Sequence, residues 1–272
     1  MTKTAAALKR PETALSTADT AELGRAFAEI VEEASALILP FWRAQVAVEQ
    51  KADMSPVTEA DQAAETLILA RLAERFPKIP VIAEEQCAAG GVPGSAPKRF
   101  LLVDPLDGTK GFLRGTEAFT VNIGLVENGR PVAGAVAAPA SGVVWHTGKG
   151  GAFRRRFGET VSQQIRVREK PAGGGVLLLS HTVPEDEADR MAAKYGCSTW
   201  QAMDSSVKFC VIAEGRADIY PRPGRTMEWD ICAAQAVLEA AGGRVITDTG
   251  DALAYGKADK GFANPGFLAV GG

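Results

Sequence analysis

The segment Leu101-Leu-Val-Asp-Pro-Leu-Asp-Gly-Thr109 constrains the fold of this chain more than any other. An apolar run leads directly into Asp104 and Asp107, and Pro105 and Gly108 indicate a turn. We therefore expect a buried strand that delivers two carboxylates to its end. Carboxylates held so close repel each other unless a cation joins them, and Mg²⁺ prefers such oxygen ligands. The pattern predicts a magnesium site; the alternative is a turn that carries two solvated acids.

The residue after this turn favours a phosphate site beside the metal. Gly108 permits close backbone approach, and Thr109 offers both a backbone N–H and a hydroxyl to an anion. If a helix begins here, its free N–H groups bind phosphate well. An aspartyl-phosphate phosphatase is disfavoured, because that class places one residue between its two acids and this chain has two. The chain also has no GxxxxGK[ST] loop, which argues against an NTPase.

The composition excludes other classes. The 272 residues include 30 Lys and Arg against 33 Asp and Glu, and a net charge of −3 creates no basic field for a nucleic acid polymer. The 4 cysteines form no CxxC pair and there are 2 histidines, which argues against a zinc site or a disulfide framework. No stretch approaches the roughly 18 apolar residues of a membrane helix. We expect a cytoplasmic protein without integral membrane association.

Hydrophobic periodicity predicts two α/β halves. We expect a flexible tail over residues 1–17, an N-terminal α+β half over 18–172 that carries most metal ligands, and a C-terminal α/β half over 173–272, together one catalytic unit. Helices are predicted over 17–38, 58–76, 184–195, 206–214 and 230–241, strands over 80–83, 100–103, 176–179, 218–220, 244–247 and 267–270, and an antiparallel meander over 119–146. We expect a surface loop over 88–97 and a solvated edge at Arg154–Arg156.

Four ordered motifs resemble the inositol monophosphatase superfamily of Mg²⁺-dependent, lithium-sensitive phosphatases. They are Val57–Asp61, Ala83–Glu85, Asp104–Thr109, and Trp229-Asp230 with Glu239–Gly243. Within that superfamily, Thr109–Phe112, Ser205–Cys210, Tyr220–Arg222 and Thr226–Asp230 are similar to the 3′(2′),5′-bisphosphate nucleotidase (CysQ-type) branch. The resemblance implies an α/β (α+β) protein built as a layered α/β/α/β sandwich of the sugar-phosphatase type.

The resemblance also implies a metal site and a catalytic pair. It implies two to three Mg²⁺ ions held by Glu84, Asp104, the backbone carbonyl of Leu106, Asp107 and Asp230. Asp61 and Thr109 would orient and deprotonate the attacking water, with Glu84 as the third catalytic residue. Taken alone, Asp61 and Asp230 are better explained as first-turn acids that only stabilise their helices, and it is the set of motifs that favours the catalytic and metal roles.

The implied substrate contacts are Glu84, Leu106, Asp107, Gly108, Thr109, Ser180, Ser206, Lys208, Arg222 and Asp230. Lys208 has an alternative interpretation as a solvated helix residue. His181 is equally compatible with a nucleotide contact and a structural hydrogen bond, and we assign His146 no role.

The resemblance implies a phosphatase that removes the 3′-phosphate of 3′-phosphoadenosine 5′-phosphate, giving AMP and phosphate in sulfur metabolism, with the sulfated form as a further candidate substrate. One alternative is an inositol-1-phosphate or sugar-phosphate phosphatase, and another is a non-catalytic nucleotide- or metal-binding module. The expected partner is a small phosphorylated nucleotide, and a homodimer is possible.

Overall fold

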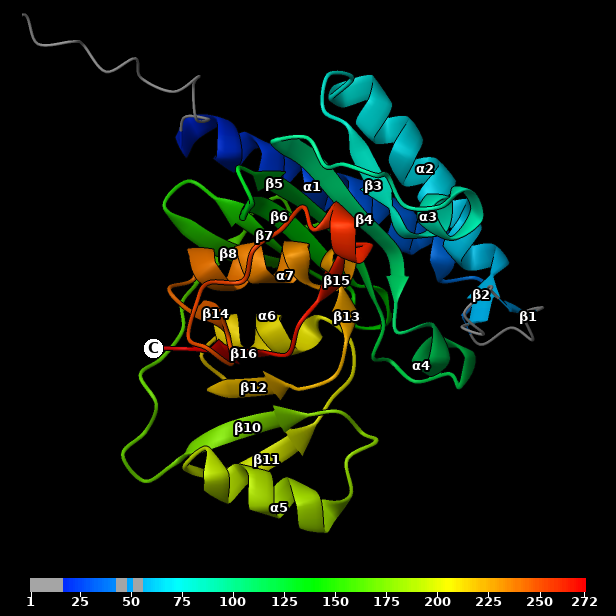
Figure 1. Cartoon of the computed structure of the whole chain (residues 1–272). Coiled ribbons are helices and arrows are strands. Elements are labelled where there is room, and N and C mark those ends of the chain that lie inside the picture. The colour runs from blue at the N-terminus through cyan, green and yellow to red at the C-terminus, as the bar shows by residue number, and fades with distance from the viewer. Residues whose placement is uncertain (1–16, 43–47, 51–55) are drawn as a thin grey trace, which may run out of the picture.

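The computed structural model describes residues 17–42, 48–50 and 56–272, and Figure 1 shows the arrangement of their helices and strands. The expected tail falls outside these residues except for Thr17, where α1 (Thr17–Ile38) begins. The short strands β1 (Val48–Gln50) and β2 (Pro56–Thr58) pair before α2 (Glu59–Arg75). The side chain of Thr58, predicted to cap α2, also lies outside the described part.

A seven-stranded sheet forms the first half of the fold. Its order is β3 (Val81–Ala83), β4 (Arg99–Asp107), β5 (Thr120–Glu127), β6 (Arg130–Ala138), β7 (Val143–Gly148), β8 (Gly151–Arg156) and β9 (Gln163–Ile165). Only β3 and β4 run parallel, so the expected meander is confirmed. The chain extends this meander through β8 and β9, which the sequence analysis did not predict. The basic cluster lies in β8, where Arg155 pairs with Glu32 at 2.5 Å and is only 11% exposed, so the predicted solvated edge was wrong there.

A five-stranded sheet forms the second half. Its order is β11 (Cys197–Ala202), β10 (Gly175–Leu179), β12 (Ile219–Arg222), β16 (Phe267–Val270) and β14 (Arg244–Thr247). β10 runs parallel to both β11 and β12, and β16 runs antiparallel to its two neighbours. A small ribbon of β13 (Thr226–Met227) and β15 (Ala263–Asn264) precedes and follows α7 (Glu228–Ala240) along the chain.

Helices separate and cover the two sheets (Figure 1). α1 and α2 cover one face of the seven-stranded sheet, and Phe27, Val31 and Ala34 of α1 are fully buried against it. α6 (Val207–Ala213) and α7 lie between the two sheets, and α5 (Glu185–Lys194) covers the outer face of the smaller sheet. The predicted layered α/β/α/β sandwich is confirmed, and α5 adds one further outer layer.

Two glycines let α7 lie close to the large sheet. A Cβ on Gly134 would lie 2.6 Å from the carbonyl oxygen of Ala233, and one on Gly124 would lie 2.5 Å from the Sγ of Cys232. Real Cβ atoms do not approach so closely, so a larger residue at either position would displace the helix. This contact holds the first turns of α7, which carry Asp230, against β5 and β6.

The segment after β3 differs from the prediction. We expected strand-end acids and then a surface loop from residue 88, but α3 (Glu84–Gly90) begins directly at Glu84. The carboxylate of Glu65 on α2 accepts hydrogen bonds from the backbone N–H groups of Glu85 and Gln86, each at 2.8 Å. These are two of the N–H groups that a helix start leaves unpaired. The cap comes from twenty residues upstream, so no local pattern announces this helix.

Candidate active site

Three carboxylates from three elements meet at the ends of the large sheet. Glu84 begins α3, Asp104 lies in β4 and Asp230 lies in the first turn of α7; each has an oxygen within 4.8 Å of the others. Asp104 is 1% exposed. Burial, followed by the charges of Glu84, Asp107 and Asp230, raises the pKa of Asp104 well above its ordinary value. A divalent cation would remove this repulsion, so the donor set fits the hard, oxygen-preferring Mg²⁺.

Asp107 lies beside this cluster and is partly buried. Burial raises its pKa, while Lys208 and the backbone N–H of Ser206 act in the opposite direction. Its Oδ2 accepts that N–H at 2.6 Å and the hydroxyl of Thr120 at 3.2 Å. One oxygen of Asp107 therefore ties the end of β4 to the start of α6, and the other remains the candidate ligand oxygen.

The turn between β4 and α4 (Thr109–Leu113) holds the remaining predicted residues of this region. Gly108 has φ 94°, and a Cβ there would lie 2.8 Å from the carbonyl oxygen of Ala118, so both backbone and space require glycine. The N–H of Leu106 donates to Asp104 at 3.0 Å, and the carbonyl of Leu106 accepts the Thr109 hydroxyl at 3.1 Å. A short helix does begin at Thr109, as the sequence suggested.

Thr109 also faces Asp61. The Thr109 Oγ1 lies 3.3 Å from the Asp61 Oδ1, and Asp61 is only 1% exposed. A first-turn acid that served only the helix would face solvent, whereas this carboxylate points at the hydroxyl beside the acidic cluster. The arrangement gives a hydroxyl and a proton acceptor next to the candidate metal ligands.

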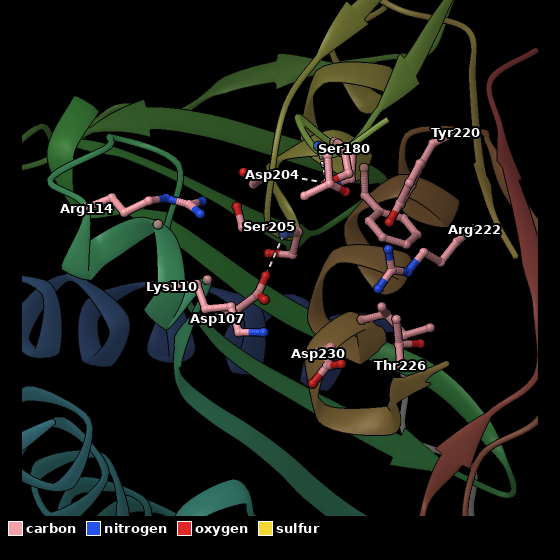
Figure 2. A pocket seen from close by; sticks show the side chains of 17 residues that line it. Asp107, Lys110, Arg114, Ser180, Asp204, Ser205, Tyr220, Arg222, Thr226 and Asp230 are labelled. Atoms are coloured by element: carbon pink, nitrogen blue, oxygen red, sulfur yellow. Dashed lines mark hydrogen bonds between the residues drawn. The ribbon is translucent and has the colours of Figure 1, made fainter. Parts of the chain in front are cut away.

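A cavity of about 280 Å³ opens beside the cluster (Figure 2). Cationic and acidic side chains share its wall: Lys110, Arg114, Lys208 and Arg222 with Asp107, Asp204 and Asp230. The structure therefore brings four predicted residues to one cavity with two of the predicted acids, Asp107 and Asp230; the four are Ser180, Ser206, Lys208 and Arg222. Lys110, Arg114 and Asp204 belong to it as well, although the sequence analysis assigned them no role.

Lys208 is buried, so its interpretation as a solvated helix residue is wrong. It is 4% exposed, its Nζ donates to the carbonyl of Met203 at 3.0 Å, and it lies 4.8 Å from the centre of the Tyr220 ring. Burial lowers the pKa of Lys208 to about 8, although Asp107 and Asp204 favour its charged form. A buried ammonium beside a cavity is a natural partner for an anion.

Ser206 and Ser180 have hydrogen-bond partners within the protein. The Ser206 hydroxyl lies 2.8 Å from both the Asn122 Oδ1 and the Thr120 Oγ1. The Ser180 hydroxyl donates to Asp204 at 2.9 Å, and the His181 Nδ1 lies 3.2 Å from the same carboxylate. His181 therefore makes the structural hydrogen bond that the sequence left open.

The sequence analysis did not predict Asp204 as a site residue, because it did not predict β11, the strand that precedes it. β10 and β11 are parallel neighbours with Leu179 opposite Ala202, so the residues that follow them meet at one edge of the sheet. Recognising β11 would have placed Asp204 beside Ser180 and His181. His146, which we assigned no role, is buried and bonded to the carbonyl of Thr147 at 2.9 Å, away from this cavity.

Comparisons with known proteins agree with this geometry. The model described as "Inositol monophosphatase family" matches residues 19–269, so the chain belongs to that family. Within the family it falls in the CysQ branch of phosphatases. It is 43% identical over 218 residues to the 3′(2′),5′-bisphosphate nucleotidase CysQ of Salmonella typhimurium, covering 80% of this chain and 86% of that protein. It is 36% identical over 245 residues to the corresponding protein of Buchnera aphidicola, covering 89% and 91%.

Solved structures share the fold. CysQ from Bacteroides thetaiotaomicron, a bacterial member of the inositol monophosphatase family, superimposes with a TM-score of 0.74 at 30% identity, covering 92% of this chain and 97% of that one. The Thermotoga maritima IMPase gives a TM-score of 0.71 at 25% identity, covering 89% of each chain.

Proposed function

We propose that this chain is a Mg²⁺-dependent 3′(2′),5′-bisphosphate nucleotidase. Its substrate is 3′-phosphoadenosine 5′-phosphate, and its sulfated form is a second candidate; the products are AMP and phosphate. The observation that carries the proposal is the acidic trio within 4.8 Å beside a cavity that four cationic side chains line. The curated relatives named above are bisphosphate nucleotidases, which supports the same substrate class.

The metal ligands in this proposal are Glu84, Asp104, the Leu106 carbonyl, Asp107 and Asp230, which would hold two to three Mg²⁺ ions. When bound, these ions would supply positive charge for the phosphate oxygens and acidify the attacking water. The carboxylates come from α3, β4 and α7 and lie close enough to share cations, which is the arrangement such a site requires.

Asp61 and Thr109 move the proton in this reaction. The Thr109 hydroxyl can donate to Asp61 and at the same time accept a hydrogen bond from water. As the water attacks phosphorus, its proton passes to the Thr109 oxygen while the hydroxyl proton passes to the Asp61 carboxylate. Glu84, a member of the acidic trio, would orient the same water. Such a positioned base typically contributes about 100- to 10,000-fold to a rate.

The cations of the cavity hold the nucleotide. Lys208 and Arg222 line it together with Asp107, so they would neutralise phosphate charge next to the acidic cluster. Arg222 has an Nε that is buried and without a hydrogen bond in the described structure, which leaves a donor for a ligand. Ser180 and Ser206 line the same cavity and shape it through their bonds to Asp204 and Asp107.

A side-by-side phosphate-release assay tests the proposal. Purified protein with Mg²⁺ is given 3′-phosphoadenosine 5′-phosphate, inositol 1-phosphate and fructose 1,6-bisphosphate at equal concentration. We expect the highest kcat/KM with the nucleotide, loss of activity with a chelator, and inhibition by lithium. Faster turnover of inositol 1-phosphate would favour the alternative phosphatase, and no turnover of any substrate would favour the non-catalytic module.

The proposal also includes a role in sulfur metabolism, a cytoplasmic location, a homodimer and two to three Mg²⁺ ions. No helix in the described ranges is long and apolar enough to cross a bilayer.

A further inference from the structure

Two cavities meet at Arg114. The first is the cavity beside the acidic cluster, and the second, of about 570 Å³, lies next to it and has a largely apolar wall that includes Trp145 and Met203. Arg114, Thr182 and Asp204 line both. In Figure 2 the Arg114 side chain extends from α4 into the first cavity, toward Ser205, on the side opposite Arg222. Of the three residues shared by both cavities, Arg114 is the one that carries a positive charge, so a ligand that occupies both can meet its guanidinium.

The backbone of Arg114 is held in place. Arg114 follows α4 directly, and its N–H bonds to the carbonyl of Lys110 at 3.4 Å. α4 is anchored by Phe112, which is buried and packs edge-on against Phe119 with ring centres 5.1 Å apart. The side chain itself is exposed. The backbone of Arg114 is thus anchored while its long side chain is exposed, so the guanidinium can reach a ligand without a change in the fold.

Within the described part of the chain, no ion pair neutralises the charge of Arg114. Glu117 and Asp204 line the same cavities, and neither pairs with it there. Asp204 instead bonds to the Ser180 hydroxyl at 2.9 Å and to the His181 ring at 3.2 Å. An unpaired guanidinium over a cavity is suited to a bidentate pair with phosphate, because its donors form a planar fork.

A bisphosphorylated nucleotide brings a second phosphate that the acidic cluster cannot hold. The cleaved phosphate occupies the carboxylates and their cations, so the other one needs cations elsewhere in the cavity. Lys208 already donates to the carbonyl of Met203 at 3.0 Å and is 4% exposed, which restricts its reach. In Figure 2 Arg114 lies on the side opposite Arg222, and its guanidinium donates to no other residue of the described ranges.

We propose that Arg114 is a specificity-determining residue whose guanidinium pairs with the phosphate that is not cleaved. It thereby selects bisphosphorylated over monophosphorylated nucleotides. This inference rests on the proposed function and adds to it a residue and the group of the substrate that this residue binds.

The test compares two nucleotides that differ only in the second phosphate. With Arg114→Gln, KM for 3′-phosphoadenosine 5′-phosphate rises about tenfold, the loss expected for one partly exposed charge-assisted contact. KM for 3′-AMP, which has the same cleaved phosphate and no other, stays within about twofold of wild type, and kcat is unchanged for both. Arg114→Lys keeps the charge and restores part of the affinity. Arg190→Gln, on α5 and 69% exposed, is the matched control and changes neither KM.

A second readout does not depend on nucleotide turnover. The product 5′-AMP carries only the uncleaved phosphate, so its inhibition of p-nitrophenyl phosphate hydrolysis weakens about tenfold in Arg114→Gln. An equal rise in KM for both nucleotides, or no rise for either, overturns the role of Arg114. The proposed function fails separately, when wild-type protein turns over inositol 1-phosphate faster than either nucleotide.

Discussion

The Thr109 hydroxyl lies 3.3 Å from the Asp61 carboxylate, although 48 residues separate the two in sequence. Asp61 belongs to α2 on one face of the large sheet, and Thr109 begins α4 just beyond the end of β4. The pair therefore exists only when α2 is docked and the Gly108 turn is formed. This makes it a product of the tertiary fold, and its contribution to the reaction can be separated from substrate binding.

Thr109→Ala tests that separation. Removal of the hydroxyl breaks the proton path to Asp61 and leaves the metal ligands in place, so we expect kcat to fall roughly 100-fold or more while KM changes little. Steady-state kinetics with the preferred substrate measures both. Thr109→Ser, which keeps a hydroxyl, is the control and retains most of kcat. A rise in KM with an unchanged kcat would contradict the proposed role of the Thr109 hydroxyl.

Asp104→Asn tests the metal site. The substitution removes charge and little volume at a residue 1% exposed, so we expect phosphate release at the assay background with the fold retained. Mg²⁺ should raise the melting temperature of wild-type protein, since a ligand that binds only the folded state stabilises it, and this shift should be lost in the variant. In metal-free buffer the variant should melt no lower than wild type, because one repelling carboxylate is gone. Asp259→Asn, at an exposed position, should behave as wild type in all three measurements.

Glu65→Gln tests the cap of α3. The amide of glutamine keeps one acceptor for the N–H groups of Glu85 and Gln86 and turns a donor toward the other, so one of the two 2.8 Å bonds is lost. We expect a loss of about 1 to 3 kcal/mol in the free energy of unfolding, measured with urea. Because Glu84 begins the same helix, the midpoint of a Mg²⁺ titration should also move to higher concentration. Glu74→Gln on the exposed side of α2 is the control, and an unchanged unfolding free energy in Glu65→Gln would falsify the capping role.

Asp218 predicts a pH dependence of stability. Burial acts to raise its pKa, but bonds from Arg168 at 3.0 and 2.7 Å and from the Val176 N–H at 2.7 Å leave the pKa below its ordinary value. A carboxyl with a lowered pKa in the folded state stabilises the fold above its unfolded pKa of about 3.9, and this stability is lost as pH falls through the folded value. Wild-type protein should therefore lose unfolding free energy below about pH 4, and Asp218→Asn should show a smaller loss over the same range. Parallel slopes for the two proteins contradict this assignment.

The sequence analysis correctly predicted the elements that have a hydrophobic pattern within their own residues. The apolar run before Asp104 gave β4 and its acids, and the alternating segments over 119–146 gave the antiparallel meander. Two of the elements that the analysis missed, α3 and β11, have causes elsewhere in the chain. α3 takes its cap from Glu65, and β11 carries Ser198, Thr199 and Gln201 on an edge, which gives it no apolar run.

In the candidate site, too, some residues were identified from sequence motifs and others became apparent only in the structure. The four ordered motifs named Glu84, Asp104 and Asp230, and the structure brings these three together. Asp204 and Arg114 were not found, although each lies within two residues of a recognised motif, because only the arrangement of the elements brings them to the cavity. The roles given to all of these residues in binding and turnover stay predictions.

α7, which carries Asp230, packs closely against Gly124 and Gly134, and its late position in the chain has a consequence for biosynthesis. The acids at residues 84 and 104 leave the ribosome long before Asp230, so a nascent chain holds an incomplete set of oxygens until its last fifth has been made. In the proposed site a metal ion would therefore meet its full set of ligands only late in translation, and a chain that ends before Asp230 would lack one of them.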